Sequence, residues 1–155
     1  MVAAQGYFFY SILFATFNSI NNTFSGCRCF SLGYTGITSN FYSFHSNFTH
    51  NEVEEGIIKA HQAYSITVVD SLFAHNSGTV SAFFLSQVTS LVSINATEFS
   101  LSDGTLFWVN ECYLQFSSNS ISSISLSNPV LDFTNGLYLE VVNNSVSNLH
   151  VDGFL

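Results

Sequence analysis

The feature that most constrains this chain is an eight-residue pattern that recurs six times along its 155 residues. Each copy begins with an apolar residue, carries a small polar residue at its sixth position and ends on a large apolar residue. The copies read FNSINNTF, FYSFHSNF, ITVVDSLF, VSINATEF, LQFSSNSI and LEVVNNSV, and their starts are 24, 25, 26, 22 and 25 residues apart. A period this constant indicates a repeat architecture in which each copy belongs to one supersecondary unit.

The residue types within the repeats favour strands. The chain has 17 Phe, 7 Tyr and a single Pro, and aromatic and β-branched residues suit pleated strands. Apolar and polar residues alternate at 66–68 and 139–141, which is the period of a strand. Turn residues precede fresh apolar runs at Gly56, Gly78, Gly104 and Gly153, and Asn128 before Pro129 fills the equivalent place in the fifth copy. We therefore expect two or three short strands per repeat.

A β-rich repeat of this length predicts one coil of a parallel β-helix. Left-handed β-helices advance in hexapeptide steps, which this sequence lacks. The prediction is thus an all-β, right-handed parallel β-helix (solenoid) of about six coils, with roughly 24 residues per coil, in one domain over residues 1–155. Because the chain ends where a seventh coil would begin, we interpret it as a segment of a longer repeat protein. A β-sandwich is the alternative, but it leaves the constant register unexplained.

Equivalent positions of the repeat predict two ladders along the coil axis. The last position gives an inward column of large apolar side chains: Phe24, Phe48, Phe73, Phe99, Ile121 and Val146. Two places earlier lies a column of small hydrogen-bonding side chains: Asn22, Ser46, Ser71, Thr97, Asn119 and Asn144. Coils about 4.8 Å apart would let each polar side chain bond to its neighbours in the stack.

Two short frames carry a family resemblance. FTHN at 48–51 and FAHN at 73–76, with the start GII at 56–58, resemble the FxxN and GG(A)I repeats of polymorphic outer-membrane proteins. More broadly, the chain is similar to right-handed parallel β-helices of the pectate-lyase-like superfamily. The resemblance covers residues 7–155 as architecture, with FxxN in two of six copies. It implies the β-helical fold and a surface or adhesive role.

Enzymes of that superfamily use clustered Asp residues, and the lyases add an Arg or Lys base. Here the two cations, Arg28 and Lys59, fall in different coils, and the acids are spread one to a coil: Asp70, Asp103, Asp132 and Asp152. We therefore expect no catalytic residue, no enzyme activity, no metal and no cofactor. The one local acidic run is Glu52, Glu54 and Glu55 beside His50; we expect a solvated loop, with a hard-cation site as the alternative.

Histidines and cysteines were the remaining candidates for chemistry. His50 and His75 both lie two places after the apolar column, so we expect their rings to stack at the surface. His45 and Asp70 both lie three places before it, so we expect them to pair and to steady two coils. The three cysteines, Cys27, Cys29 and Cys112, are predicted to be buried thiols, because a C-x-C pair in one strand is too close for a disulfide and no second pair completes a zinc site.

The surface composition suggests where such a chain would work. Asn21, Asn47, Asn95 and Asn143 begin Asn-x-Ser/Thr sequons and are candidate glycosylation sites, although chance would produce about as many. A formal net charge of −8 disfavours nucleic acid as a partner, and no apolar run is long enough for a membrane-spanning helix. We expect an extracellular or cell-surface location.

These features predict a non-enzymatic structural or adhesive segment. Its expected partners are protein, including self-association through neighbouring coils end to end, or glycan. The alternative is a carbohydrate-active β-helix, a polysaccharide lyase or hydrolase, whose catalytic residues lie outside this segment.

Overall fold

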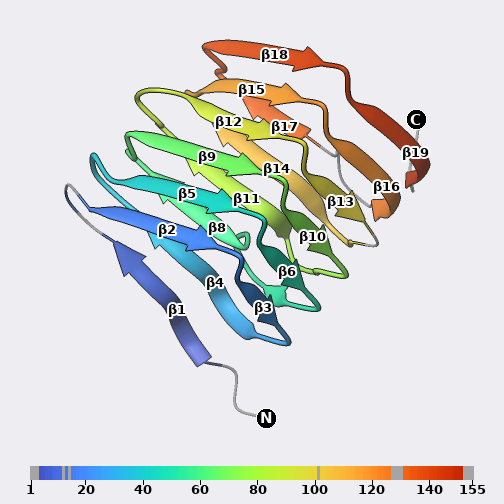
Figure 1. Ribbon diagram of the computed structural model, residues 1–155, viewed down its shortest axis with the longest axis horizontal. Coiled ribbons are helices and arrows are strands. Elements are labelled where there is room, and N and C mark those ends of the chain that lie inside the picture. Colours follow the sequence, from blue (N-terminus) through green and yellow to red (C-terminus); the bar gives the residue numbers. More distant parts are fainter. Residues whose placement is uncertain (1–3, 12, 14, 101, 127–130, 152–155) are drawn as a thin grey trace.

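The computed structural model describes residues 4–11, 13, 15–100, 102–126 and 131–151. Its strands pair in parallel into three sheets that wind into a solenoid (Figure 1). We name these sheets A, B and C. Every turn of the chain passes through B, then C, then A, so residues about 25 positions apart lie side by side.

Sheet A contains β1 (Ala4–Ser11), β4 (Arg28–Thr35), β8 (Ile58–His61), β11 (Val80–Ser86), β14 (Thr105–Asn110) and β17 (Leu131–Thr134), and the short β7 (Glu52–Val53) pairs with β4. Sheet B contains β2 (Thr16–Ile20), β5 (Asn40–Phe44), β9 (Ser65–Val69), β12 (Val92–Asn95), β15 (Tyr113–Ser117) and β18 (Tyr138–Val142). Sheet C contains β3 (Thr23–Ser25), β6 (Asn47–Thr49), β10 (Leu72–Ala74), β13 (Glu98–Ser100), β16 (Ser120–Leu126) and β19 (Ser145–Val151).

The predicted fold class is confirmed. Six strands in each of sheets B and C delimit five turns, and the parallel pairing excludes the antiparallel β-sandwich. In Figure 1 the nearer strands of sheet B run from left to right while the chain climbs towards its C-terminus, which is the right-handed sense. This is also the sense expected of parallel crossovers between twisted strands.

The bend between sheets B and C has a constant length, and the other two bends vary. Seven positions separate each core residue of sheet B from the apolar column of sheet C, as from Phe17 to Phe24 and from Leu139 to Val146. From sheet A to sheet B, the separation is nine positions from Phe83 to Val92 but seven from Phe107 to Leu114. The repeat visible in the sequence is therefore the B–C bend, and the uneven interval arises at the other bends.

Each bend is turned by a residue with positive φ. At the B–C bend these residues have φ between 48° and 56° and are Asn21, His45, Asp70, Ala96, Ser118 and Asn143. The A–B bend uses Thr38, Gln62, Gln87, Glu111 and Asn135, and the C–A bend uses Gly26, His50 and His75. Asn, Asp and His adopt this left-handed conformation more readily than other side chains. Their frequency at the bends thus has a backbone cause.

Glycine is required where two coils approach most closely. A Cβ on Gly104 would lie 1.9 Å from the carbonyl oxygen of Gly78, its counterpart one coil earlier, and Gly104 has φ +88°. No other residue avoids both the clash and the strained backbone. Gly56 also has positive φ, whereas Gly153, Asn128 and Pro129 lie outside the described residues.

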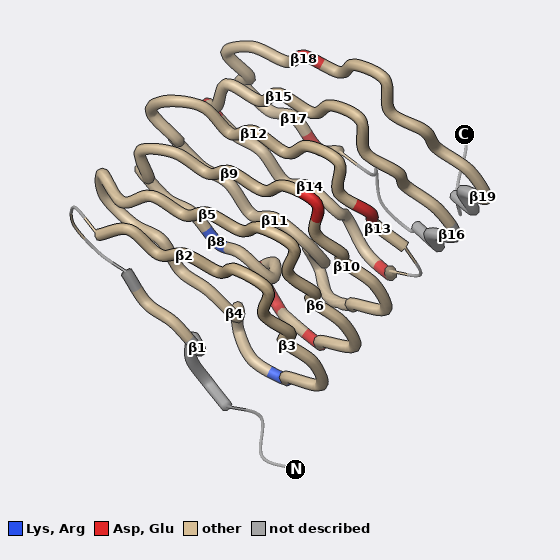
Figure 2. The backbone as a smooth tube through the Cα atoms, viewed as in Figure 1, with Lys and Arg blue, Asp and Glu red and all other residues tan. Residues whose placement is uncertain are grey.

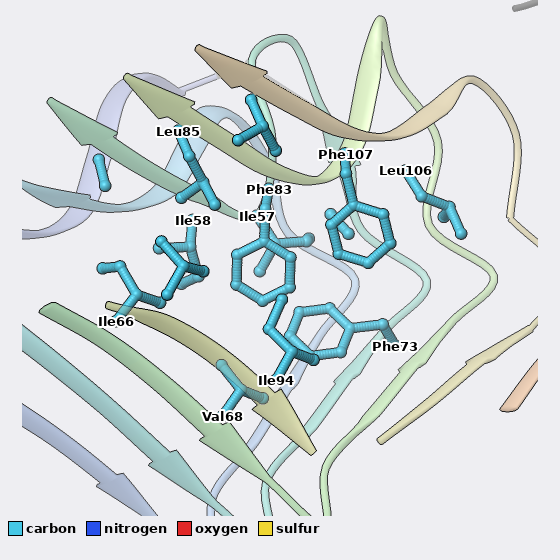
Figure 3. Packing of buried hydrophobic residues seen from close by; sticks show 14 of the residues in the cluster. Ile57, Ile58, Ile66, Val68, Phe73, Phe83, Leu85, Ile94, Leu106 and Phe107 are labelled. Carbon is cyan, nitrogen blue, oxygen red and sulfur yellow. The ribbon is translucent and has the colours of Figure 1, made fainter. Parts of the chain in front are cut away.

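The core is a column of stacked side chains enclosed by the three sheets (Figure 3). Phe48, Phe73 and Phe99 are fully buried, and their ring centroids lie 4.7 and 5.2 Å apart in sequence. Sheet A contributes Phe83 and Phe107, whose rings stack at 5.7 Å. Burying a Phe side chain stabilises a fold by about 1.5–3 kcal/mol, so this column is the main support of the solenoid.

Candidate recognition surface

The residues of the two predicted ladders lie in register. Sheet C pairs Phe24 with Phe48, and the same register continues through Phe73, Phe99, Ile121 and Val146. In the polar ladder, the Ser46 backbone N–H donates to Ser71 Oγ at 3.3 Å, and the Thr97 backbone N–H donates to Asn119 Oδ1 at 2.9 Å. The remaining members are Asn22, whose N–H donates to Ser46 Oγ, and Asn144, whose Oδ1 accepts from the backbone and side chain of Asn119.

The FxxN asparagines form a second polar ladder that the sequence did not reveal. Asn51 Oδ1 accepts from the Cys27 backbone N–H at 3.0 Å, and Asn76 Oδ1 accepts from the Asn51 backbone N–H at 3.0 Å. Their side-chain amides donate across the core to the carbonyl oxygens of Phe24 and Phe48. Both side chains are buried. The Asn of this frame therefore closes the C–A bend by satisfying backbone groups in adjacent coils.

The histidines lie as their spacing indicated. The rings of His50 and His75 stack with centroids 4.6 Å apart and planes 11° apart, and His45 Nδ1 lies 3.8 Å from a carboxylate oxygen of Asp70. All four side chains are exposed at bends. Among the described residues, no three His, Cys, Asp or Glu side chains are grouped so that they could hold a metal ion.

The acidic run contacts both cations of the chain. Arg28 pairs with Glu52 at 2.9 Å, and Lys59 pairs with Glu55. Glu54 is exposed. Figure 2 shows the other described acids, Asp70, Asp103 and Asp132 among them, scattered over the solenoid; Asp103 Oδ1 accepts from the Gly104 N–H in a turn. Asp152 lies outside the described residues. The structure thus brings acids to cations and not to one another.

The three cysteines are free thiols. Burial, with a smaller contribution from Cys27, raises the pKa of Cys29 from 9.0 to about 11. Burial also raises the pKa of Cys112, which lies in the core with its Sγ donating to the Asn110 carbonyl oxygen. Cys27 and Cys29 are half-buried against the core rather than fully buried.

The four sequons all lie at the B–C bend. Asn21 and Asn143 are the positive-φ residues of that bend in the first and last coils, and Asn47 begins β6 on its far side. These three side chains are exposed, whereas Asn95 is half-buried at the end of β12 and accepts a bond from Ser117 Oγ. The sequons therefore share one edge of the solenoid.

An aromatic row, which sequence reasoning missed, follows the outer face of sheet A. The row consists of Tyr10, Tyr34, Lys59, Phe84 and Trp108, which pair in register on five successive strands. Tyr10 stacks on Tyr34 at 4.9 Å and Phe84 on Trp108 at 4.3 Å. Lys59 Nζ lies 5.3 Å from the Phe84 ring centroid and 5.0 Å from that of Phe30. Because β-bulges shift the register of sheet A, a single period did not align these residues.

A hollow of about 370 Å³ lies along the A–B bends, at the left of Figure 1. It occurs where the longest A–B bend adjoins the shortest one. Gln62, Gln87 and Glu111 line it as one row: Gln62 Nε2 donates to Gln87 Oε1 at 3.2 Å, and Gln87 Nε2 donates to Glu111 Oε2 at 2.9 Å. Intervals of 25 and 24 residues relate these side chains, so the period of the chain would have identified the row.

Comparison with protein-family models, with curated proteins and with solved structures finds no match to this chain. The described part of the chain contains no helix with the length and apolar character needed to cross a membrane.

Proposed function

We propose that this chain is a non-enzymatic structural or adhesive segment of an extracellular or cell-surface protein. The observation that carries the proposal is the outer aromatic row, which presents similar side chains at every coil from Tyr10 to Trp108. Tyr and Trp are enriched at protein contact surfaces because they combine an apolar body with a polar tip. Repetition of one weak contact along a rigid rod gives multivalent adhesion.

The use of the ionisable groups agrees with this proposal. Arg28, Lys59 and His45 each pair with an acid, and His50 stacks on His75. These contacts join neighbouring coils or bends, and so they strengthen the rod. The FxxN frames that resemble those of polymorphic outer-membrane proteins also serve the coil, through Asn51 and Asn76.

The proposed location includes glycan attachment at the sequons. Asn21, Asn47 and Asn143 are exposed at the B–C bend. Attached glycans would extend from that edge and leave the outer face of sheet A uncovered.

The test displays the chain on beads at high and low density. The beads are washed over surfaces coated with a neutral polysaccharide, with polygalacturonate or with extracellular-matrix protein. We expect retention on one of these surfaces that rises steeply with bead density, and weaker retention for Trp108→Ala. Polygalacturonate with and without Ca²⁺ should release no unsaturated product. Beads that are retained on none of the surfaces, or that release unsaturated product, would contradict the proposal.

A further inference from the structure

We propose that the A–B hollow binds a short neutral oligosaccharide, with the row of Gln62, Gln87 and Glu111 contacting its hydroxyl groups. This inference names a ligand class for the surface and rests on the proposed adhesive function. The hollow, about 370 Å³, is at the small end of the range typical of ligand sites. It therefore suits a few sugar units and not a protein segment.

The row has the hydrogen-bonding groups that sugar hydroxyls need. A carboxamide has two N–H donors and one acceptor oxygen, and a hydroxyl both donates and accepts. Within the row, Gln62 and Gln87 each donate one N–H, to Gln87 Oε1 and Glu111 Oε2 respectively. One N–H of each amide and one Glu111 oxygen are left for a ligand. Because the row bonds to itself, the side chains are held in place before a ligand arrives, which lowers the entropy cost of binding.

Apolar groups lie at the rim of the row. Ile37 lines the hollow with 43% of its surface exposed. Tyr64 and Tyr113 follow Gln62 and Glu111 by two residues on the same bends and are 52% and 44% exposed. Sugar rings have apolar C–H faces between their hydroxyls, so a mixture of amides and exposed apolar side chains matches both parts of the ligand. Thr38 and Thr89 add hydroxyls at the lining.

Charge selects a neutral ligand over an acidic one. Glu111 contributes a carboxylate to the hollow, and the formal net charge of the chain is −8. Both cations are already engaged: Arg28 pairs with Glu52, and Lys59 pairs with Glu55 between two aromatic rings. A polyuronate carboxylate would meet like charge here, which is destabilising.

The experiment follows the side-chain amide resonances of Gln62 and Gln87 by NMR during titration with cello-, xylo- and manno-oligosaccharides. Trigalacturonate is the acidic counterpart. An open site of this kind should bind with a dissociation constant of about 1 mM. We expect at least one neutral oligosaccharide to shift both amides, and trigalacturonate to shift neither.

Variants separate the row from the rest of the surface. Gln62→Ala with Gln87→Ala should weaken binding by about tenfold or more. Gln115→Ala is the matched control, because Gln115 donates to Glu140 at 3.1 Å in the same kind of pair on sheet B, outside the hollow. Glu111→Gln should retain neutral binding and should admit trigalacturonate. Circular dichroism checks that each variant keeps the fold.

The inference is overturned if no neutral oligosaccharide shifts the amides at about 10 mM, if trigalacturonate binds equally well, or if Gln115→Ala weakens binding as much as the double variant. Bead adhesion that survives the double variant, together with absent oligosaccharide binding, would leave the proposed adhesive function standing while the inference falls.

Discussion

Single buried polar residues hold the bends of this solenoid, because each one satisfies backbone groups that a strand ladder cannot reach. Asn51 illustrates the case. Its oxygen accepts from the Cys27 N–H, and its amide donates to the Phe24 carbonyl oxygen and to Asn76 Oδ1. A buried backbone group without a partner is costly. At this scale, stability depends on hydrogen bonds that join three successive coils.

Asn51→Ala should therefore lower the free energy of unfolding by about 2–3 kcal/mol, since several buried partners lose their bonds together. Urea denaturation followed by circular dichroism measures the change. Asn18→Ala is the control: Asn18 is exposed on β2, and its loss should change stability by less than about 0.5 kcal/mol. Equal effects from both substitutions would show that the ladder is not a source of stability.

Thr35→Val should have the opposite effect. Thr35 is fully buried in sheet A, and its Oγ1 is the one buried side-chain polar atom without a hydrogen-bond partner in the described part of the chain. The residue paired with it in the next coil is Ala60, followed by Leu85 and Val109. Removing an unsatisfied hydroxyl of the same shape should stabilise the fold by about 1 kcal/mol. A destabilised variant in urea denaturation would mean that the hydroxyl has a partner.

Cys29 should make stability fall at high pH. Its folded-state pKa is raised from 9.0 to about 11, so between these values the folded thiol keeps a proton that the unfolded thiol has lost. The contribution to stability is complete below pH 9 and is lost as pH rises through about 11. Cys29→Ser should flatten this part of the stability profile. An unchanged slope between the two proteins would assign the decline to other groups.

At the scale of elements, the bends differ in how much variation they tolerate. The B–C bend keeps its seven-position separation in every coil, whereas the A–B separation ranges from seven to nine. A one-residue slip inside a constant bend would turn the inward side chains of the following strand outward. A loop that already varies absorbs an extra residue at little entropic cost.

One Gly inserted after Thr89, in the A–B bend, should thus cost about 1 kcal/mol or less. One Gly inserted after Asp70, in the B–C bend, should cost several kcal/mol or prevent folding, because Phe73 would leave the core. Thermal and urea unfolding of the two insertion variants make the comparison. Similar losses from both insertions would show that the constant length is not a requirement of the fold.

The same difference between bends explains what could be predicted from the sequence. The B–C bend has one length, so its columns, from Phe24 to Val146, could be aligned by counting. The outer row could not, because bulges in sheet A shift Lys59 and Phe84 against Tyr34. The hollow depends on unequal lengths of neighbouring bends, and such a difference carries no motif. Positive φ at His45, His50 and His75 was likewise invisible to spacing.

At the scale of the whole molecule, charge repulsion competes with a few ion pairs. The formal net charge is −8, and like charges along a short rod destabilise the compact state. The Arg28–Glu52 pair is 53% and 57% exposed, and an exposed pair contributes only about 0.2–1 kcal/mol. Salt screens both effects. Ten acids against two cations mean that repulsion is the larger of the two.

Raising NaCl from about 20 mM to about 500 mM should therefore stabilise the chain, by about 0.5–1 kcal/mol, since the Debye length falls well below the width of the rod. Urea denaturation is the suitable measurement, because urea is uncharged. The variant with Glu54→Gln and Glu98→Gln supplies the control: both side chains are exposed, and removing two negative charges should raise stability at low salt and flatten the response. Salt that instead destabilises the protein would mean that the ion pairs of Arg28 and Lys59 outweigh the repulsion among the acids. The coils would then be held together by these two residues far more than by the screened surface.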